Sequence, residues 1–309
     1  MAYFLLLGGL VIMVVCGNIL VTGSVQLARY FRISTLVVGL TIVAYGTSTP
    51  EIFIGVRAAL DGSHDIALGN VIGSNFANIG IILAIVAIIM PIPIRNKSLG
   101  FDMAIMFGVT VLLLIFGLNG VISRMEAIIF LTLLIVYTVW VVHKSRENAK
   151  DEVIPTPTIK PLIAIGMILV SFVGLYFGSG WFVDGARKLA MAWGVSERVI
   201  GISIVAVGTS APELIVSLVA IFKKEADLSI GNIIGSNFFN IVGVLGITAV
   251  VSPIMISDQT LFRSDMVWLF GISFALVLMM LPMARGKISR WESLVLLLIF
   301  ATYMFILYR

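Results

Sequence analysis

Ten long apolar stretches, separated by short polar segments, dominate the pattern of hydrophobic and polar positions along the chain. A helix needs about 20 predominantly apolar residues to cross a bilayer, and each stretch is of this order. The pattern therefore predicts an all-α integral membrane protein. Its ten transmembrane helices are expected at roughly 3–28, 35–58, 66–91, 101–118, 124–142, 161–186, 197–221, 228–252, 264–282 and 291–308.

Composition supports this fold class. Hydrophobic residues make up 60% of the 309 residues and charged residues 12%, against about 25% charged in typical soluble domains. Mean hydropathy is +1.13. These values exclude a water-soluble enzyme and a disordered chain. Basic residues stand at the ends of apolar runs, where they anchor helices at the membrane surface, so nucleic acid is not an expected partner.

An internal repeat organises the chain. Residues 39–51 (GLTIVAYGTSTPE) and 201–213 (GISIVAVGTSAPE) agree at nine of thirteen positions at an offset of 162. Residues 65–80 (DIALGNVIGSNFANIG) and 227–242 (DLSIGNIIGSNFFNIV) agree at ten of sixteen positions at the same offset. The chain is therefore a tandem duplication.

Each half of the duplication holds five predicted spans. Because five is odd, the second half must enter the membrane from the opposite side, and such inverted repeats are typical of secondary transporters. We expect a first five-helix repeat over 1–142, a cytoplasmic linker loop over 143–160, and a second, inverted repeat over 161–309. The linker is charged and contains Pro155 and Pro157, as expected of a loop.

Two glutamates, Glu51 and Glu213, lie deep within predicted spans and are repeat equivalents. An acidic residue at the bilayer centre costs about 2.5–3.5 kcal/mol on insertion scales. The nearest basic residue, Arg57, lies two turns away from Glu51 and has no counterpart in the second half. A bound cation is therefore the natural partner of the two carboxylates.

A proline precedes each glutamate, Pro50 in the first half and Pro212 in the second. Proline lacks an N–H and crowds the preceding helical turn, so each helix should break there and free carbonyl oxygens. Hydroxyl side chains stand three and four residues before each glutamate, on its helical face: Thr47, Ser48, Thr209 and Ser210. The alternative is a simple kink whose hydroxyls bond back to the helix.

The second motif combines close-packing glycines with polar residues. Its GxxxG pairs, Gly69 with Gly73 and Gly231 with Gly235, favour close helix packing. Serine and asparagine four residues apart share one face in each half: Ser74 with Asn78, and Ser236 with Asn240. Asn70, Asn75, Asn232 and Asn237 are left open, as ligands or as bridges between helices. All candidate ligand atoms are oxygen, which suits Ca²⁺ and Na⁺ better than Zn²⁺ or Cu²⁺.

The two motif pairs, GTSTPE with GNVIGSNFANIG and GTSAPE with GNIIGSNFFNIV, resemble those of the sodium/calcium exchanger family in the cation/calcium antiporter superfamily. The resemblance covers the whole chain and is strongest to compact prokaryotic members. It implies ten helices in two inverted five-helix repeats, with broken helices 2, 3, 7 and 8 forming the ion-binding core.

The resemblance also implies a ligand set. Ca²⁺ would be held by Glu51, Glu213 and the carbonyls of Thr47 and Thr209. The Na⁺ positions would use Ser48, Ser74, Ser210, Ser236 and the carbonyls of Ala44 and Ala206, with Asn78 and Asn240 lining the middle. Some relatives, notably potassium-dependent exchangers, carry aspartate at the position of Asn78 or Asn240. The amides found here argue against K⁺ co-transport.

The expected function is thus a secondary antiporter that exchanges Na⁺ for Ca²⁺ by alternating access, with an H⁺- or K⁺-coupled exchanger as the alternative. An intramembrane enzyme is not expected. A zinc protease would need an HExxH motif, in which neither histidine lies, and an aspartyl protease would need two aspartates near mid-span. A P-loop is absent from the sequence, so ATP drive is not expected. A channel is a further alternative and would show flux without counter-ion dependence. We expect no cofactor beyond the transported ions. We also expect a monomer whose partners are Ca²⁺, Na⁺ and the lipid bilayer.

Orientation follows from the basic residues, which are in excess on the cytoplasmic side of membrane proteins. In the ten-span topology, seven Lys and Arg residues fall on the side of the N-terminus and thirteen on the other side. We therefore predict a multi-pass protein of the cell membrane, with both termini extracellular and the linker in the cytoplasm.

This topology can be tested by cysteine labelling. In a Cys16→Ser background, Lys150→Cys should react with an impermeant thiol reagent only from the cytoplasmic side, because residue 150 lies in the linker. Labelling of that cysteine from the outside of intact cells would reverse the orientation.

Overall fold

The computed structural model describes residues 1–93, 99–148, 155–194, 206–279 and 287–307. In the first half, the helices are α1 (Ala2–Phe31), α2 (Thr35–Val38), the π-helix η1 (Gly39–Val43), α3 (Ala44–Thr47), α4 (Thr49–Leu60), α5 (His64–Ala77), the π-helix η2 (Asn78–Leu83), α6 (Ala84–Ile89), α7 (Leu99–Gly117) and α8 (Arg124–Asn148). Two short strands, β1 (Ile92–Pro93) and β2 (Val121–Ile122), lie between them.

The second half follows the same order. Its helices are α9 (Pro161–Ala192), α11 (Ala206–Thr209), α12 (Ala211–Phe222), α13 (Ala226–Phe239), the π-helix η5 (Asn240–Leu245), α14 (Gly246–Val251), α15 (Gln259–Met279) and α16 (Arg290–Leu307). Strands β3 (Ile254–Met255) and β4 (Lys287–Ile288) complete it.

Among these residues, seven helices are long and apolar enough to cross a membrane, and an eighth span is the bent pair Thr35–Thr47 with Thr49–Leu60. Each coincides with an expected span to within a few residues. The expected spans at 197–221 and 291–308 contain the shorter apolar helix α12 and the helix α16. Helix α8 continues to Asn148, so the first part of the expected linker, 143–148, is helical. Residues 149–154 of that linker lie outside the described residues.

The helix over 35–60 bends by 45° at Ser48. Ser48 has φ −84° and ψ 13°, and its equivalent Ser210 has nearly the same backbone, with φ −85° and ψ 9°. Both lie outside the helical region, and each is followed within two residues by a proline. Proline is tolerated in the first turn of a helix, so α4 and α12 begin afresh after the bend.

The breaks expected in helices 3 and 8 are not found. Residues 64–89 form one helix, as do residues 226–251. Each contains a π-helical segment instead, which begins at Asn78 in the first half and at Asn240 in the second. A π segment accommodates an extra residue without ending the helix. Neither stretch contains a proline, so no backbone N–H is lost and nothing forces a break.

The chain forms two compact units, and each unit takes residues from both sequence repeats. Unit 1 comprises 1–50 and 141–232, and unit 2 comprises 51–140 and 233–309. One boundary falls between Pro50 and Glu51, next to the bend at Ser48. The other falls within α13, between Asn232 and Ile233.

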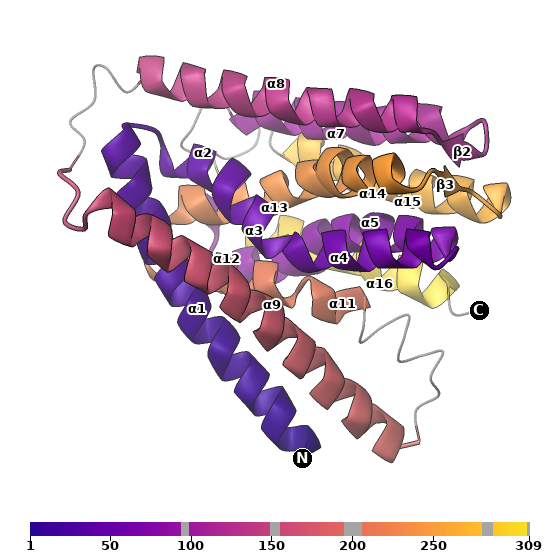
Figure 1. Ribbon diagram of the computed structural model, residues 1–309, viewed down its shortest axis with the longest axis horizontal. Helices are drawn as coiled ribbons and strands as arrows, with labels where there is room; N and C mark the ends of the chain where they lie inside the picture. The colour runs from indigo at the N-terminus through magenta and orange to yellow at the C-terminus, as the bar shows by residue number, and fades with distance from the viewer. Residues whose placement is uncertain (94–98, 149–154, 195–205, 280–286, 308–309) are drawn as a thin grey trace. The chain divides into compact units, whose positions relative to one another are not determined.

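In unit 1, α1 and α9 lie side by side and run in opposite directions (Figure 1). Two equivalent glycines allow the close approach. A Cβ at Gly23 would lie 3.1 Å from the Ala164 carbonyl, and a Cβ at Gly185 would lie 2.4 Å from the backbone nitrogen of Leu6. Residue 23 thus meets the start of α9, while residue 185 meets the start of α1. The two contacts are therefore reciprocal between the equivalent helices α1 and α9.

Unit 2 is held together by contacts that cross between the two sequence halves. Strand β1 pairs with β4, and β2 pairs with β3, both antiparallel. The Arg124 guanidinium donates to the Val250 carbonyl, and its equivalent Arg290 donates to the Ile88 carbonyl. The first turn of α8 in one half is thereby tied to the end of α14 in the other, and α16 is tied to α6 in the same way.

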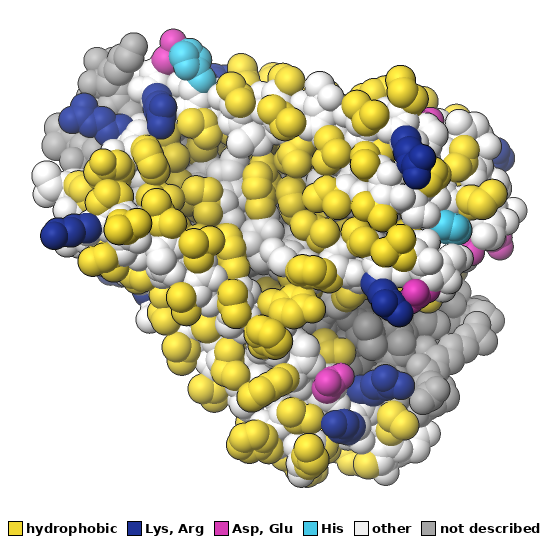
Figure 2. All heavy atoms as spheres, in the orientation of Figure 1, with side chains coloured by type: hydrophobic (Ala, Val, Ile, Leu, Met, Phe, Trp, Pro, Cys, Tyr) yellow, Lys and Arg dark blue, Asp and Glu magenta, His cyan; other side chains and the backbone are white. Residues whose placement is uncertain are grey.

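Large apolar side chains cover much of the surface. Leu162, Met125 and Val267 are each at least 70% exposed. Figure 2 shows hydrophobic side chains over most of the visible face, with only a few charged ones. Exposed apolar area on this scale is unfavourable in water and is explained by contact with lipid.

The packing of α9 on α1 yields a stability prediction. Gly185→Leu would drive a side chain into the backbone of α1, and overpacking of this kind costs about 1–3 kcal/mol. The melting temperature in detergent should therefore fall by several degrees. Gly180→Leu is the matched control on the same helix, because no described atom lies within 4 Å of a Cβ built there. Equal melting temperatures for the two variants would show that the close approach is unimportant.

Candidate functional site

The carboxylate of Glu213 lies in the first turn of α12 and is fully buried. The Ser48 hydroxyl donates a hydrogen bond of 2.9 Å to its Oε1. Its Oε2 makes no hydrogen bond to any described residue. Because a carboxylate can accept about four hydrogen bonds, most of this group's capacity is left for another ligand. The two motif sequences thus meet in unit 1, since Ser48 comes from the first repeat and Glu213 from the second.

Thr47 lies beside this pair and is also fully buried. Its hydroxyl lies 3.2 Å from both the Ala44 carbonyl and the Asn232 side-chain oxygen, and can donate to either. The Ala44 carbonyl also accepts from the Ser48 backbone N–H. The simple-kink alternative is thus partly correct, because a motif hydroxyl does bond back to its own helix. A cation at the Ala44 carbonyl would have to replace one of these donors.

The Asn232 side chain forms hydrogen bonds with residues of two other helices in this part of unit 1. Its amide donates to the Ser217 hydroxyl at 2.9 Å and to the Glu213 carbonyl at 3.4 Å, while its oxygen accepts from Thr47. Asn232 and Ser217 are both fully buried. Asn232 therefore acts as a bridge between α12, α13 and α3. Sequence reasoning left this residue open and overlooked Ser217, although Ser217 stands four residues after Glu213 and so shares its helical face.

The remaining predicted ligands in unit 1 are Thr209, Ser210 and Ala206. Thr209 and Ser210 are buried, at 5% and 2% exposure. The Ser210 hydroxyl makes no hydrogen bond within the described part of the chain. Ala206 is the first residue of α11. Unit 1 therefore holds seven of the twelve predicted ligand residues: Ala44, Thr47, Ser48, Ala206, Thr209, Ser210 and Glu213.

Unit 2 holds the other five. Glu51 lies in the first turn of α4 and is fully buried, and its carbonyl accepts a hydrogen bond of 3.4 Å from the Asn70 amide. Ser74 and Ser236 are also buried, at 1% and 0% exposure. Glu51 thus takes the same place at the start of its helix in unit 2 as Glu213 does in unit 1.

Asn78 and Asn240 each open a π-helical segment and are fully buried. Neither the amide nitrogen nor the oxygen of either side chain has a hydrogen-bond partner among the residues that the structure describes, and the Ser74 hydroxyl likewise has none. An unsatisfied buried polar atom costs about 1–3 kcal/mol. Several such atoms on the predicted ligand residues indicate a polar ligand that completes them.

Of two other motif asparagines, Asn75 joins two helices and Asn237 bonds back to its own helix. The Asn75 amide donates to the Asn237 carbonyl at 3.2 Å, which ties α5 to α13 within unit 2, and the Asn237 amide donates to the Ile233 carbonyl at 2.8 Å. Gly231 lies close to the Leu36 carbonyl, so close helix packing is confirmed there. At Gly69 and Gly73 a Cβ would meet no described atom within 4 Å.

The donor chemistry of both units is dominated by hydroxyl, amide and backbone oxygen. Groups of three or more His, Cys, Asp or Glu side chains that could hold a metal ion do not occur within the described ranges. Such oxygens suit Ca²⁺ and Na⁺, which are bound by oxygen ligands. They do not suit transition metals that require nitrogen or sulfur.

A family model described as sodium/calcium exchanger protein matches residues 1–143 and 163–309. The chain belongs to this family. Among solved structures, the sodium-calcium exchanger NCX_Mj soaked with Na⁺ and Ca²⁺ is similar at a TM-score of 0.84 and 31% identity, covering 98% of this chain and 97% of that one.

Curated relatives cover nearly the whole chain as well. The sodium/calcium exchanger MaX1 of Methanosarcina acetivorans is 28% identical, covering 99% of this chain and 98% of the relative. The inner membrane protein YrbG of Escherichia coli is 32% identical, covering 90% and 88%. The exchanger family and the apolar helices make this chain a multi-pass membrane protein and a cation/Ca²⁺ antiporter.

The bridging role of Asn232 yields a prediction with a matched control. Asn232→Leu would leave the Ser217 hydroxyl and the Glu213 carbonyl without their buried partner, at a cost of about 2–4 kcal/mol. The equivalent change Asn70→Leu removes only one long hydrogen bond and should cost less than about 1 kcal/mol. Thermal unfolding in detergent without divalent cations measures both, and a similar loss in the two variants would contradict the bridge.

Proposed function

We propose that this exchanger couples Na⁺ entry to Ca²⁺ movement by alternating access, using ten helices arranged as two inverted five-helix repeats. The observation that carries the proposal is the set of buried polar atoms without hydrogen-bond partners on the motif residues Glu213, Ser210, Ser74, Asn78 and Asn240. A protein with no need of a polar ligand gains nothing by retaining them.

We assign Ca²⁺ to Glu51, Glu213 and the backbone carbonyls of Thr47 and Thr209. Two carboxylates balance one divalent cation, and the buried position of each glutamate raises the energetic cost of leaving it uncompensated. The backbone departs from helical geometry at Ser48 and Ser210, three residues before each glutamate, and we assign the neutral oxygen ligands to carbonyls of these segments.

We assign Na⁺ to Ser48, Ser74, Ser210, Ser236 and the carbonyls of Ala44 and Ala206, with Asn78 and Asn240 lining the space between the sites. The hydrogen bond from Ser48 to Glu213 fits this role. Because the hydroxyl donates its hydrogen bond to the carboxylate, its oxygen lone pairs are left for a cation. One glutamate can thereby support a Na⁺ ion that it does not itself bind.

Shared ligands make Na⁺ and Ca²⁺ mutually exclusive, which is the basis of exchange. At a tenfold Na⁺ gradient and 100 mV, each entering Na⁺ releases roughly 3.7 kcal/mol. Expelling one Ca²⁺ against that potential costs about 4.6 kcal/mol. Two Na⁺ ions would sustain about two decades of Ca²⁺ gradient and three Na⁺ nearly five decades. Calcium extrusion therefore favours three Na⁺ per Ca²⁺.

The alternative is coupling to H⁺ or K⁺. The amides at Asn78 and Asn240 favour Na⁺, because neither adds a third carboxylate to hold an additional cation or a proton. We place the protein in the cell membrane as a monomer, with both termini outside and the linker in the cytoplasm.

Flux measurements test this function. In proteoliposomes, Glu51→Gln and Glu213→Gln should each abolish Na⁺-dependent Ca²⁺ uptake. Loss of one carboxylate charge about 4 Å from a divalent cation removes about 8 kcal/mol of attraction at an effective dielectric constant of about 20, or roughly six orders of magnitude in affinity. Glu147→Gln is the control, because Glu147 is exposed at the end of α8 and its loss should leave uptake unchanged.

Replacement of Na⁺ by choline distinguishes the coupling ions. Uptake that persists in choline and follows an imposed pH or K⁺ gradient would contradict Na⁺ coupling. Near-normal uptake in either glutamine variant would contradict the assigned site.

A further inference from the structure

Two aspartate–tyrosine pairs, one buried and one partly buried, lie in unit 2, outside the residues assigned to ions. The Tyr137 hydroxyl on α8 donates a hydrogen bond of 2.9 Å to Asp102 on α7. The Tyr303 hydroxyl on α16 donates a hydrogen bond of 3.1 Å to Asp265 on α15. Asp102 is 1% exposed and Tyr137 7%. A carboxyl group within an apolar helix is costly enough to suggest a function.

The two pairs are repeat equivalents. Asp102-Met103 recurs as Asp265-Met266 at an offset of 163, and Tyr137 recurs as Tyr303 at an offset of 166. The offset between equivalent residues is 162 in the two motifs and 166 in Ile-Ser-Arg-x-Glu at the start of the last helix of each half. The offsets of the aspartates and tyrosines lie within this range, so the pairs fit the same duplication. The same hydrogen bond thus forms twice, between the last two helices of each half.

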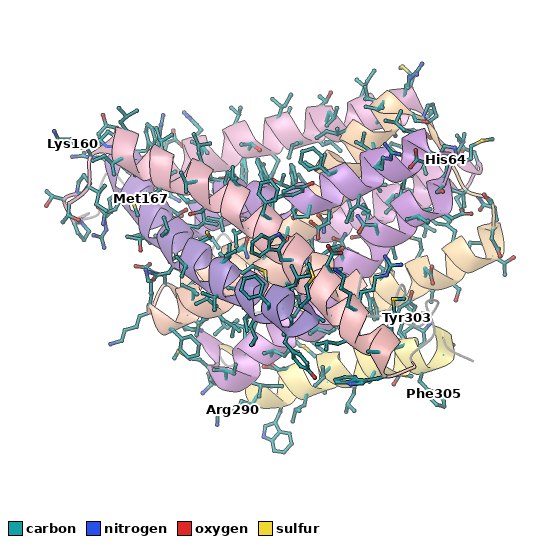
Figure 3. All side chains as sticks on the ribbon, turned by 60° about the horizontal axis from the view of Figure 1, so that its bottom comes forward. His64, Lys160, Met167, Arg290, Tyr303 and Phe305 are labelled. Carbon is teal, nitrogen blue, oxygen red and sulfur yellow. The ribbon has the colours of Figure 1, made fainter. Side chains whose placement is uncertain are left out.

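Each tyrosine packs on a phenylalanine from the other half. The ring of Tyr137 lies 4.5 Å from that of Phe238 on α13, and the ring of Tyr303 lies 4.5 Å from that of Phe76 on α5, both tilted by about 50°. Phe238 and Phe76 are themselves repeat equivalents and are at most 2% exposed. Figure 3 shows Tyr303 on the side of α16 toward its neighbouring helices, whereas Phe305 projects outward.

Both phenylalanines stand two residues before an asparagine that opens a π-helical segment. Phe76 precedes Asn78 and η2, and Phe238 precedes Asn240 and η5. A π segment changes the rotation of the helix at the point where it begins. The direction of each asparagine therefore depends on the last α-helical turn before it, which is the turn that each tyrosine contacts.

The hydrogen bond to aspartate fixes the orientation of the tyrosine ring against phenylalanine, which apolar packing alone would not do. A phenylalanine ring in place of tyrosine would fill the same space and could tilt freely, whereas the hydroxyl bound to aspartate fixes the ring against α7 or α15. Aromatic pairs at this distance contribute beyond their buried area. A fixed tyrosine ring thus holds the phenylalanine, and with it the helical turn before the asparagine.

We propose that Asp102 with Tyr137 positions Asn240, and that Asp265 with Tyr303 positions Asn78. The inference rests on the proposed function, since it treats the two asparagines as lining the ion sites. Asp102, Tyr137, Asp265 and Tyr303 are positioning residues, which act on the ions only through α13 and α5. The last two helices of each half thus set the geometry of the second motif in the other half.

The first test removes one oxygen atom from each pair and measures Ca²⁺ binding to purified protein by calorimetry. Tyr137→Phe and Tyr303→Phe should each weaken Ca²⁺ affinity about three- to tenfold while the rings remain in place. Tyr3→Phe is the control, because Tyr3 is 63% exposed. Wild-type affinity in both Tyr137→Phe and Tyr303→Phe would overturn the proposal.

Conservative replacement of Asp102 distinguishes the effect of its hydrogen bond to tyrosine from the effect of its negative charge. Asp102→Asn keeps an oxygen that can accept the Tyr137 hydroxyl, so it should bind Ca²⁺ within about twofold of wild type. Asp102→Leu has no acceptor and should match Tyr137→Phe. If Asp102→Asn were as impaired as Asp102→Leu, the negative charge would be what matters, and the positioning role would be wrong.

A double-mutant cycle tests the crossed assignment. The effect of Tyr137→Phe should shrink when Asn240→Ala is already present and should be unchanged in an Asn78→Ala background, because groups that act through each other are not additive. Tyr303→Phe should show the reverse. Equal effects in both backgrounds would indicate general stability and contradict the proposal.

The wild-type protein supplies the control for the function itself. If it lacks Na⁺-dependent Ca²⁺ flux and Ca²⁺ binding, the proposed function fails before any variant is compared. If wild type exchanges and binds while the tyrosine variants match it, only the positioning inference fails.

Discussion

A carboxylate buried at membrane depth is the constraint on which this protein depends. The Glu213 carboxylate accepts a hydrogen bond from Ser48, and its Oε2 has no hydrogen-bond partner among the described residues. A buried carboxylate of this kind is energetically unfavourable unless a cation binds close to it. Pro212 allows α12 to begin after the bend at Ser210, and Asn232 bonds to the Glu213 carbonyl and to Ser217 beside this group. In the function proposed above, stability and transport therefore depend on the same atoms.

Hydrogen bonds between the two sequence halves occur in both units of the structure. Ser48 from the first half bonds to Glu213 from the second, and Thr47 bonds to Asn232. In unit 2, Arg124 caps the end of α14, while Asn75 bonds to the backbone of Asn237. Some of these contacts form twice through equivalent residues, as Arg124 with Val250 and Arg290 with Ile88 do. The bond from Ser48 to Glu213 is not repeated by its equivalents, because the Ser210 hydroxyl has no hydrogen-bond partner among the described residues. Neither repeat is a self-contained domain in this arrangement.

Much of this could be predicted from the sequence, for physical reasons. Membrane spans follow from apolar length, and the bends at Ser48 and Ser210 follow from Pro50 and Pro212. The burial of Glu51 and Glu213 follows from their place within apolar runs. The π-helical segments at Asn78 and Asn240 could not be predicted, because no residue type marks them as proline marks a break. The bridge through Ser217 and Asn232 and the pairs Asp102–Tyr137 and Asp265–Tyr303 depend on which helices meet, and single-sequence periodicity does not contain that information.

The crossed strand pairs have a consequence for biosynthesis. Strand β1 ends at Pro93 and pairs with β4, which begins almost two hundred residues later at Lys287. At about 5–20 residues per second, the first strand waits roughly 10–40 s for its partner to emerge from the ribosome. During that interval, Ile88 also lacks Arg290, and the helices of the first half lie in the membrane without the neighbours that later cover them. The nascent half is therefore the species most exposed to proteolysis and insertion chaperones, and final assembly awaits the end of translation.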